Sequence, residues 1–132
     1  MKNRVWIFAA FFLLPGFGQG EEAVVQKSPL SADFVIATDV QDREPVGGSE
    51  PFSKKTEFLF AWTRIKGATE PTKIKHIWIH ENEVLSSVPL PIRSSYYRTW
   101  SRREIEGKKG RWKVEVRDAQ DRLIAAKEFI VK

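Results

Sequence analysis

The sequence predicts an all-β protein, an antiparallel immunoglobulin-like β-sandwich of about seven strands preceded by a signal peptide. Two observations lead to this fold class. Short runs rich in β-branched and aromatic residues recur at intervals of about 8 to 15 residues, with turn residues between them. After residue 20, no stretch shows a long helical period. We therefore expect two packed antiparallel sheets and no layer of helices.

The first segment, residues 1–20, has the pattern of a secretory signal peptide. Two basic residues precede an uncharged run at 5–14, which is too short to span a bilayer as a helix of about 20 residues. Pro15 interrupts a helix, and small residues at 18–20 are typical of a cleavage site. We expect cleavage before Glu21 and a periplasmic or secreted product. An uncleaved N-terminal anchor is the alternative.

Beyond the signal, residues 21–32 are expected to form a flexible leader and residues 33–132 a single β-sandwich domain. The chain contains no Cys, which excludes disulfides and thiol catalysis. Its net charge of +5 is uneven, because residues 92–132 hold 12 basic and 6 acidic side chains. Such a surface can attract an anionic partner or can simply be solvated. Export disfavours nucleic acid as that partner.

The N-terminal half of the domain predicts two strands separated by a long loop. Residues 34–40 form the first strand, and the Gly- and Pro-containing segment 41–52 forms the loop. Residues 56–64 alternate, so Phe58, Phe60 and Trp62 share one face. We expect that face to lie in the core.

The middle of the domain predicts a hairpin. The strand that contains His76 and Trp78 runs to His80, and Glu81-Asn82 turns the chain into residues 83–88. Trp78 is expected between the sheets. Pro89 and Pro91 are expected to end the second strand, because proline cannot donate to an interior ladder.

The C-terminal third predicts three further strands. The first lies at 94–101, and Ser101 is positioned to cap a short helical turn at 101–104. Residues 111–118 and 122–131 are expected to form a hairpin. Its inward side chains are expected to be Trp112, Val114, Phe129 and Val131.

Several short sequence motifs that contain aromatic residues follow one another from residue 60 onward. They are Phe60-x-Trp62-Thr63-Arg64, His76-Ile77-Trp78, Tyr97-Arg98-Thr99-Trp100-Ser101, Gly110-Arg111-Trp112-Lys113-Val114-Glu115-Val116 and Glu128-Phe129-x-Val131. Over about residues 34–131, this series resembles the bacterial domain-of-unknown-function family numbered 2914. The resemblance implies an exported or membrane-tethered β-domain, and it implies no activity, ligand or catalytic residue.

The sequence offers little catalytic chemistry. His76 and His80 are four residues apart, and on a strand this separates them by about 13 Å, too far to share a metal ion. Ser101 and His76 could serve as nucleophile and base, but no nucleophile elbow surrounds Ser101. We therefore expect no enzyme, no metal and no cofactor.

The candidate ligand-binding residues combine aromatic rings with basic side chains. They are Tyr96, Arg98, Trp100, Arg102, Arg103, Lys108, Lys109, His76 and Trp78. In one interpretation, Arg98 lines a groove in which aromatic rings stack on sugars and guanidinium binds carboxylate or phosphate. In the other, Arg98 stacks on a Trp and bonds a buried carbonyl, a structural role.

Two functions follow from these interpretations. The first is a non-catalytic binding module of the bacterial cell envelope, with envelope glycan or another anionic polymer as its partner. The second is an immunoglobulin-like accessory subunit that pairs with another envelope protein through an exposed sheet face or edge and has no small-molecule site.

Overall fold

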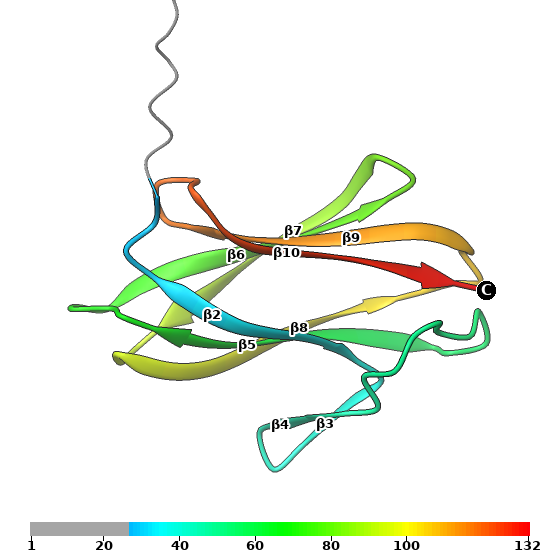
Figure 1. Cartoon of the computed structure of the whole chain (residues 1–132), viewed down its shortest axis with the longest axis horizontal. Coiled ribbons are helices and arrows are strands. Elements are labelled where there is room, and N and C mark those ends of the chain that lie inside the picture. The colour runs from blue at the N-terminus through cyan, green and yellow to red at the C-terminus, as the bar shows by residue number, and fades with distance from the viewer. Residues whose placement is uncertain (1–26) are drawn as a thin grey trace, which may run out of the picture.

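The computed structural model describes residues 27–132, and all of its strand pairs are antiparallel (Figure 1). The predicted signal peptide therefore lies outside the described residues. The strands of the described part are β2 (Ser31–Ala37), β3 (Asp39–Gln41), β4 (Glu44–Val46), β5 (Phe58–Lys66), β6 (Thr72–His80), β7 (Glu83–Ile92), β8 (Tyr96–Glu104), β9 (Gly110–Asp118) and β10 (Leu123–Val131). None of the described residues forms a helix long and apolar enough to cross a membrane.

Two sheets enclose the core in a sandwich-like arrangement. One sheet has the strand order β10-β9-β6-β7, and the other has the order β2-β5-β8. A small third sheet, the β3–β4 hairpin, projects from the end of β2 (Figure 1). The prediction of an all-β, antiparallel protein is confirmed.

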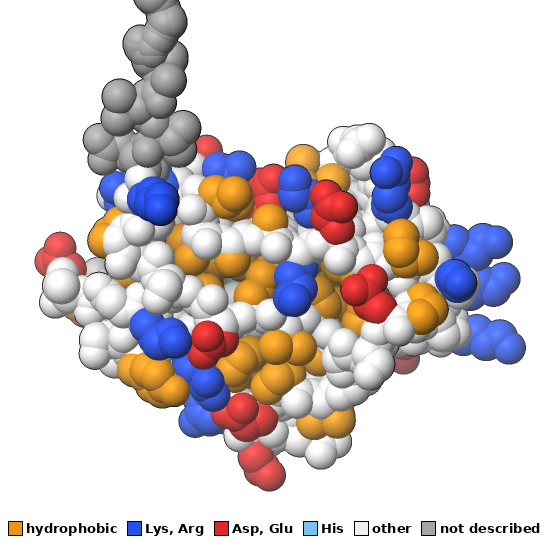
Figure 2. Space-filling model, viewed as in Figure 1, with side chains coloured by type: hydrophobic (Ala, Val, Ile, Leu, Met, Phe, Trp, Pro, Cys, Tyr) orange, Lys and Arg blue, Asp and Glu red, His pale blue; other side chains and the backbone are white. Residues whose placement is uncertain are grey.

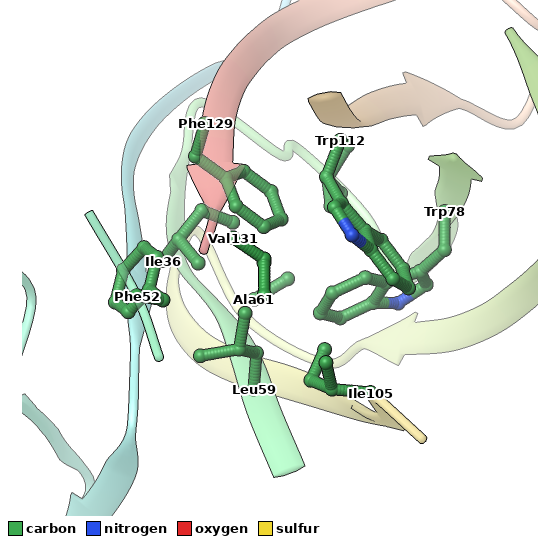
Figure 3. Packing of buried hydrophobic residues seen from close by; sticks show 10 residues of the cluster. Ile36, Phe52, Leu59, Ala61, Trp78, Ile105, Trp112, Phe129 and Val131 are labelled. Atoms are coloured by element: carbon green, nitrogen blue, oxygen red, sulfur yellow. The ribbon is translucent and has the colours of Figure 1, made fainter. Parts of the chain in front are cut away.

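The larger core cluster is built around two tryptophans of the four-stranded sheet (Figure 3). Trp78 and Trp112 meet edge to face with ring centroids 6.5 Å apart, and Phe129 stacks on Trp112 at 6.1 Å. Small aliphatic side chains of β5, Leu59 and Ala61, face them. The predicted inward positions Trp78, Trp112, Val114, Phe129 and Val131 are all buried. A second cluster around Ile65, Ile74, Ile92 and Val116 fills the rest of the interior.

The predicted core face of β5 is wrong. Leu59, Ala61, Thr63 and Ile65 point inward and are fully buried, whereas Phe58 and Phe60 lie on the outer face and are only half-buried. Trp62 is buried, but on that same outer face. The reason is space, because packed sheets lie about 10 Å apart and the tryptophans of the opposite sheet already fill the gap. Only smaller side chains fit against them.

The predicted loop at 41–52 contains ordered structure. Asp39–Gln41 and Glu44–Val46 pair as β3 and β4 around a two-residue turn at Asp42 and Arg43, both with positive φ. Two consecutive positive φ values are typical of a type I′ hairpin turn, and a sequence without glycine in the turn gave no clear sign of it. The first strand also ends at Ala37 rather than Val40.

β7 and β8 continue past their predicted ends. β7 includes Pro89 and Pro91, because it is the edge of its sheet and prolines two residues apart point their missing N–H groups to the same, unpaired side. β8 runs through Ser101 to Glu104, so the predicted helical turn is wrong. The ladder with β5, in which Ser101 opposes Ala61, outweighs the local capping pattern.

Candidate functional site

The outer face of the three-stranded sheet carries alternating aromatic and arginine side chains. We call it the aromatic–arginine face; its members are Phe58, Phe60, Trp62 and Arg64 of β5 and Tyr96, Arg98, Trp100 and Arg102 of β8. In the cross-strand register, Trp62 opposes Trp100 and Arg64 opposes Arg98. The predicted cluster Tyr96, Arg98 and Trp100 therefore lies on one face, as the alternation requires.

The β3–β4 hairpin lies over this face and bonds to it. The indole Nε1 of Trp62 donates to the carbonyl oxygen of Arg43 at 2.9 Å. Arg43 in turn donates through Nη2 to the carbonyl oxygen of Arg98 at 3.1 Å, and its guanidinium lies 5.6 Å from the ring centroid of Trp100. The hairpin thus covers Trp62 and part of Trp100.

Carboxylates pair with two of the three arginines of this face, Arg64 and Arg98. Glu44 accepts from Arg98 at 2.5 Å and lies 3.5 Å from Nη2 of Arg64. The other terminal nitrogen of Arg64, Nη1, donates to Asp33 at 3.1 Å. The hydrogen bond from Arg64, with a second one from Lys66, keeps the pKa of Asp33 below its usual value despite partial desolvation. Arg98 therefore already has a carboxylate partner within the chain. This geometry favours its structural role.

The remaining predicted residues separate into three places. Tyr96 is 60% exposed at one end of β8, and Arg102 covers Phe58 at the other, with its guanidinium 4.1 Å from the ring centroid. Lys108 and Lys109 lie in the turn between β8 and β9. His76 and Trp78 are fully buried between the sheets, so no surface ligand reaches them.

His76 belongs to a buried hydrogen-bond network. Trp78 donates through Nε1 to the hydroxyl of Ser101 at 3.1 Å, and that hydroxyl lies 2.7 Å from Nδ1 of His76. On the other side of the ring, Nε2 lies 3.3 Å from the hydroxyl of Thr63, which donates to the carbonyl oxygen of Thr99 at 2.9 Å. One proton arrangement satisfies every group, with Ser101 donating to Nδ1 and the Nε2–H donating to Thr63.

This network keeps the imidazole neutral. Burial lowers the pKa of His76 to about 3, because no carboxylate accompanies the ring to stabilise its charge. Ser101 and His76 are close enough for proton exchange, but both are buried within a fully bonded network. The arrangement specifies core packing and offers no substrate access. Residues 27–132 also contain no group of three potential metal ligands.

A second surface, which we call the basic end, forms where the C-terminal residues of β10, the 53–56 loop and the β8–β9 turn meet. Six cations lie here that take no part in the ion pairs of residues 27–132: Lys54, Lys55, Lys108, Lys109, Arg111 and Lys132. Figure 2 shows Lys and Arg side chains projecting from this end of the molecule. The backbone N–H of Lys54 donates to the carbonyl of Lys132 at 2.7 Å, which joins the two segments.

Sequence reasoning found only two members of the basic end, Lys108 and Lys109. Lys54 and Lys132 are 78 positions apart in the chain, and no local pattern marks them as neighbours. The contact depends on the segment around Phe52, which forms a parallel bridge to Val131. An isolated bridge of this kind leaves no periodic signal in the sequence.

Comparison with known proteins finds a matching family model and similarity to 28 chains of solved structures. None of the curated proteins matches the sequence. A solved structure, a β-glucosidase from Kluyveromyces marxianus, is similar with a TM-score of 0.44 and 14% identity. The similarity covers 78% of this chain and 14% of that one, so the chain spans a small part of the enzyme's length.

The family model described as "Protein of unknown function (DUF2914)" matches residues 71–131, which include β6 to β10. The aromatic motifs from His76 to Val131 lie within this match, and the motif at 60–64 precedes it. The family resemblance inferred from the sequence is confirmed over residues 71–131, which match the model of this family of proteins of unknown function.

Proposed function

We propose that the protein is a non-catalytic, extracytoplasmic binding module of the bacterial cell envelope, and that its basic end recognises an anionic glycan or another anionic polymer. The observation that carries the proposal is how the cations are distributed. Arg64 and Arg98 on the aromatic–arginine face are paired with Asp33 and Glu44. The six cations of the basic end have no such partners among the ion pairs of residues 27–132.

Unpaired cations on one small surface favour a polymeric partner. Each exposed Lys or Arg interacts weakly with a single anion because water and salt screen it. A polyanion engages several of them at once and releases its condensed counterions, which makes binding stronger and dependent on salt. Acidic groups also border this surface: Glu57 and Glu106 lie in the same loops, Glu104 ends β8, and Glu81 accepts from the backbone N–H of Arg111 at 2.6 Å.

The extracytoplasmic location rests on the N-terminal sequence. Residues 1–20 combine a basic start, a short apolar run and small residues before Glu21, which supports a cleaved signal peptide. If it is cleaved, intact mass measurement of protein from an envelope fraction will find a chain that begins at Glu21. A majority of molecules that retain Met1 would contradict export by this route.

The strand order supports the immunoglobulin-like version of the sandwich. In constant-type domains the sheets are ordered A-B-E-D and C-F-G. Here β2-β5-β8 matches A-B-E, and β10-β9-β6-β7 matches G-F-C with the fourth strand moved beside C. Such domains present loops at both ends of the sandwich. The basic end is one of these loop clusters.

A charge-matched pair of variants tests the binding proposal. In the first, Lys54, Lys108, Lys109 and Lys132 are replaced by Gln, and in the second, the exposed cations Lys27, Lys73, Arg93 and Lys127 are replaced by Gln. We expect the first variant to elute from isolated cell-wall glycan at clearly lower salt than the wild type, and the second to elute close to it. Equal elution of both variants would mean that net charge, rather than the basic end, governs retention.

The alternative function, a protein-interaction module, is favoured by a different observation. On the aromatic–arginine face, Arg64 and Arg98 are paired with carboxylates and the β3–β4 hairpin covers Trp62, whereas the edge strand β8 has free backbone groups. A partner that adds a strand would use that edge.

A further inference from the structure

The four edge strands of the two larger sheets differ in how they are protected. β7 carries Pro89 and Pro91, which interrupt a row of edge donors. β10 is bridged at its end by Phe52, whose N–H donates to the carbonyl of Ile130. β2 lies alongside β10 (Figure 1). β8 is the remaining edge, nine residues long and without proline or glycine.

The hydrogen-bond register of β8 identifies which backbone groups are free. At one end of the β5–β8 ladder, Gly67 N–H donates to Ser95, and at the other, Ile105 N–H donates to Glu57. The register between them is unbroken, so the odd-numbered residues direct their backbone groups toward β5. The even-numbered residues direct theirs away from the sheet.

Two of these outward backbone groups already have hydrogen-bond partners. The carbonyls of Tyr96 and Arg98 accept bonds from Ser94 and Arg43. No strand and no side-chain hydrogen bond of residues 27–132 reaches the outward groups of Trp100, Arg102 and Glu104. This half of β8 therefore presents the unpaired N–H and C=O groups that an added strand requires.

A groove lies beside the same half of β8. It has a volume of about 420 Å³ and runs between β8 and the edge strand β7 of the other sheet. Its lining residues are Phe58, Ser86, Val88, Arg102, Arg103, Glu104 and Glu106. Arg103 opposes Leu59 on the inward side of β8, and its Nε is buried without a hydrogen-bond partner. The groove is thus lined mainly by polar and charged side chains, with Phe58 and Val88 as its apolar members.

The charge of β8 favours an acidic partner. Within the free half of the strand, Arg102 and Arg103 outnumber Glu104, and neither arginine takes part in an ion pair of residues 27–132, whereas Arg98 is already paired with Glu44. Arg103 is also a charged residue that points inward, a feature that discourages edge-to-edge pairing of identical chains. Two copies of β8 would bring their arginines together, whereas an acidic strand would pair with them.

We propose that the free half of β8, from Trp100 to Glu104, binds an extended acidic segment of a partner protein by strand addition. The segment's backbone pairs with the outward groups of Trp100, Arg102 and Glu104. Its carboxylates contact Arg102 and Arg103, and its apolar side chains enter the groove beside Val88. This site borders the basic end at Glu104 and Glu106, but its arginines, Arg102 and Arg103, are not among the cations of the basic end.

The probe for this proposal is an eight-residue peptide of alternating Val and Glu with blocked termini, at millimolar concentration. Its control is the corresponding Val and Lys peptide. We expect the Glu peptide to slow amide hydrogen exchange at Trp100, Arg102 and Glu104 by at least about tenfold, because added hydrogen bonds protect edge amides. The Lys peptide should leave these amides unchanged. Slowed exchange with both peptides, or with neither, would overturn the proposal.

Two substitutions at one position separate strand addition from charge attraction. Arg102→Ala removes the guanidinium and keeps the outward N–H, while Arg102→Pro removes both without breaking a bond to β5. We expect Ala to weaken peptide binding several-fold and Pro to abolish it. Equal binding by the two variants would overturn the proposal in favour of charge alone.

Two further controls complete the test. Thermal melting checks that Arg102→Pro remains folded; if it does not, Glu104→Pro beside Glu104→Ala makes the same comparison, because the Glu104 N–H also points outward. The variant with four Gln residues at the basic end should keep the peptide-induced protection. Loss of that protection would place the peptide at the basic end and overturn the edge site, as would dimerisation of the chain through β8.

Discussion

The four tryptophans of the described chain occupy two different environments. Trp78 and Trp112 lie between the sheets in a buried cluster with Phe129. Trp62 and Trp100 lie opposite each other on the outer face of the three-stranded sheet, covered by arginines and by the β3–β4 hairpin. The first pair fills the core, and the second pair holds a hairpin against a sheet. Large aromatic side chains alone therefore do not mark the inside of this sandwich.

The largest expected effect separates these environments directly. Trp112→Ala should lower the free energy of unfolding by about 3–5 kcal/mol, because it leaves a cavity between packed sheets. Trp100→Ala should cost less than about half as much, since its ring is partly exposed and water can fill the space. Urea denaturation of both variants measures the difference. Equal losses would mean that the outer face is packed as tightly as the core.

The sequence contained the information that decides the orientation of β5, but only over the whole strand. Phe58, Phe60 and Trp62 favour the core if they are considered alone. Extending the same alternation brings Arg64 and Lys66 onto their face. The opposite set, Leu59, Ala61, Thr63 and Ile65, contains no charge and is the buried one. Period-2 alternation shows which residues share a face, and the least charged face then predicts the inside.

Other features of the structure had weaker signals in the sequence, or none. The strands β6, β9 and β10 and both hairpins that contain them follow from alternation and turn residues. The contact of Lys54 with Lys132 depends on chain closure over 78 positions, and no local pattern encodes it. Likewise, the alternation placed Tyr96, Arg98 and Trp100 together, but not Glu44, which occupies Arg98 and comes from a segment predicted as loop.

The second prediction tests the polar part of the interior. The pKa of His76 is about 3 in the folded chain, against 6.5 when unfolded, so below pH 6.5 the unfolded chain binds more protons. Stability should be complete above pH 6.5 and fall by up to about 1.4 kcal/mol per pH unit as the pH decreases toward 4. His76→Gln should remove most of this slope, and His80→Gln should keep it. Urea titrations over this range measure it, and a flat wild-type profile would mean that water or a counter-charge reaches the ring.

The third prediction compares the indole donors of the two environments. Trp78→Phe leaves the Ser101 hydroxyl without its donor inside the core, which should cost about 1–3 kcal/mol. Trp62→Phe frees the carbonyl of Arg43, which is exposed enough for water to replace the bond, so the cost should be at most about 1 kcal/mol. The outer substitution should still release the hairpin, seen as faster amide exchange at residues 39–46 with unchanged exchange in β9. Slow exchange in both segments would show that the indole bond does not hold the hairpin.

The smallest expected effect concerns Arg98. Its partner Glu44 is about half exposed, and Arg98 itself is one-third exposed, so solvent screens the pair. Arg98→Lys keeps the charge and loses the planar geometry by which one guanidinium can bridge Glu44 and the sheet. We expect a loss below about 1 kcal/mol that becomes smaller in high salt. A double-mutant cycle with Glu44→Gln isolates the coupling, because the Arg43 bond to the Arg98 carbonyl does not depend on the side chain.

A loss well above 1 kcal/mol that persists in high salt would instead place Arg98 in a desolvated site and make the outer face resemble the core. No loss and no coupling would leave Arg98 available to a ligand and return the aromatic–arginine face to the candidate binding surfaces.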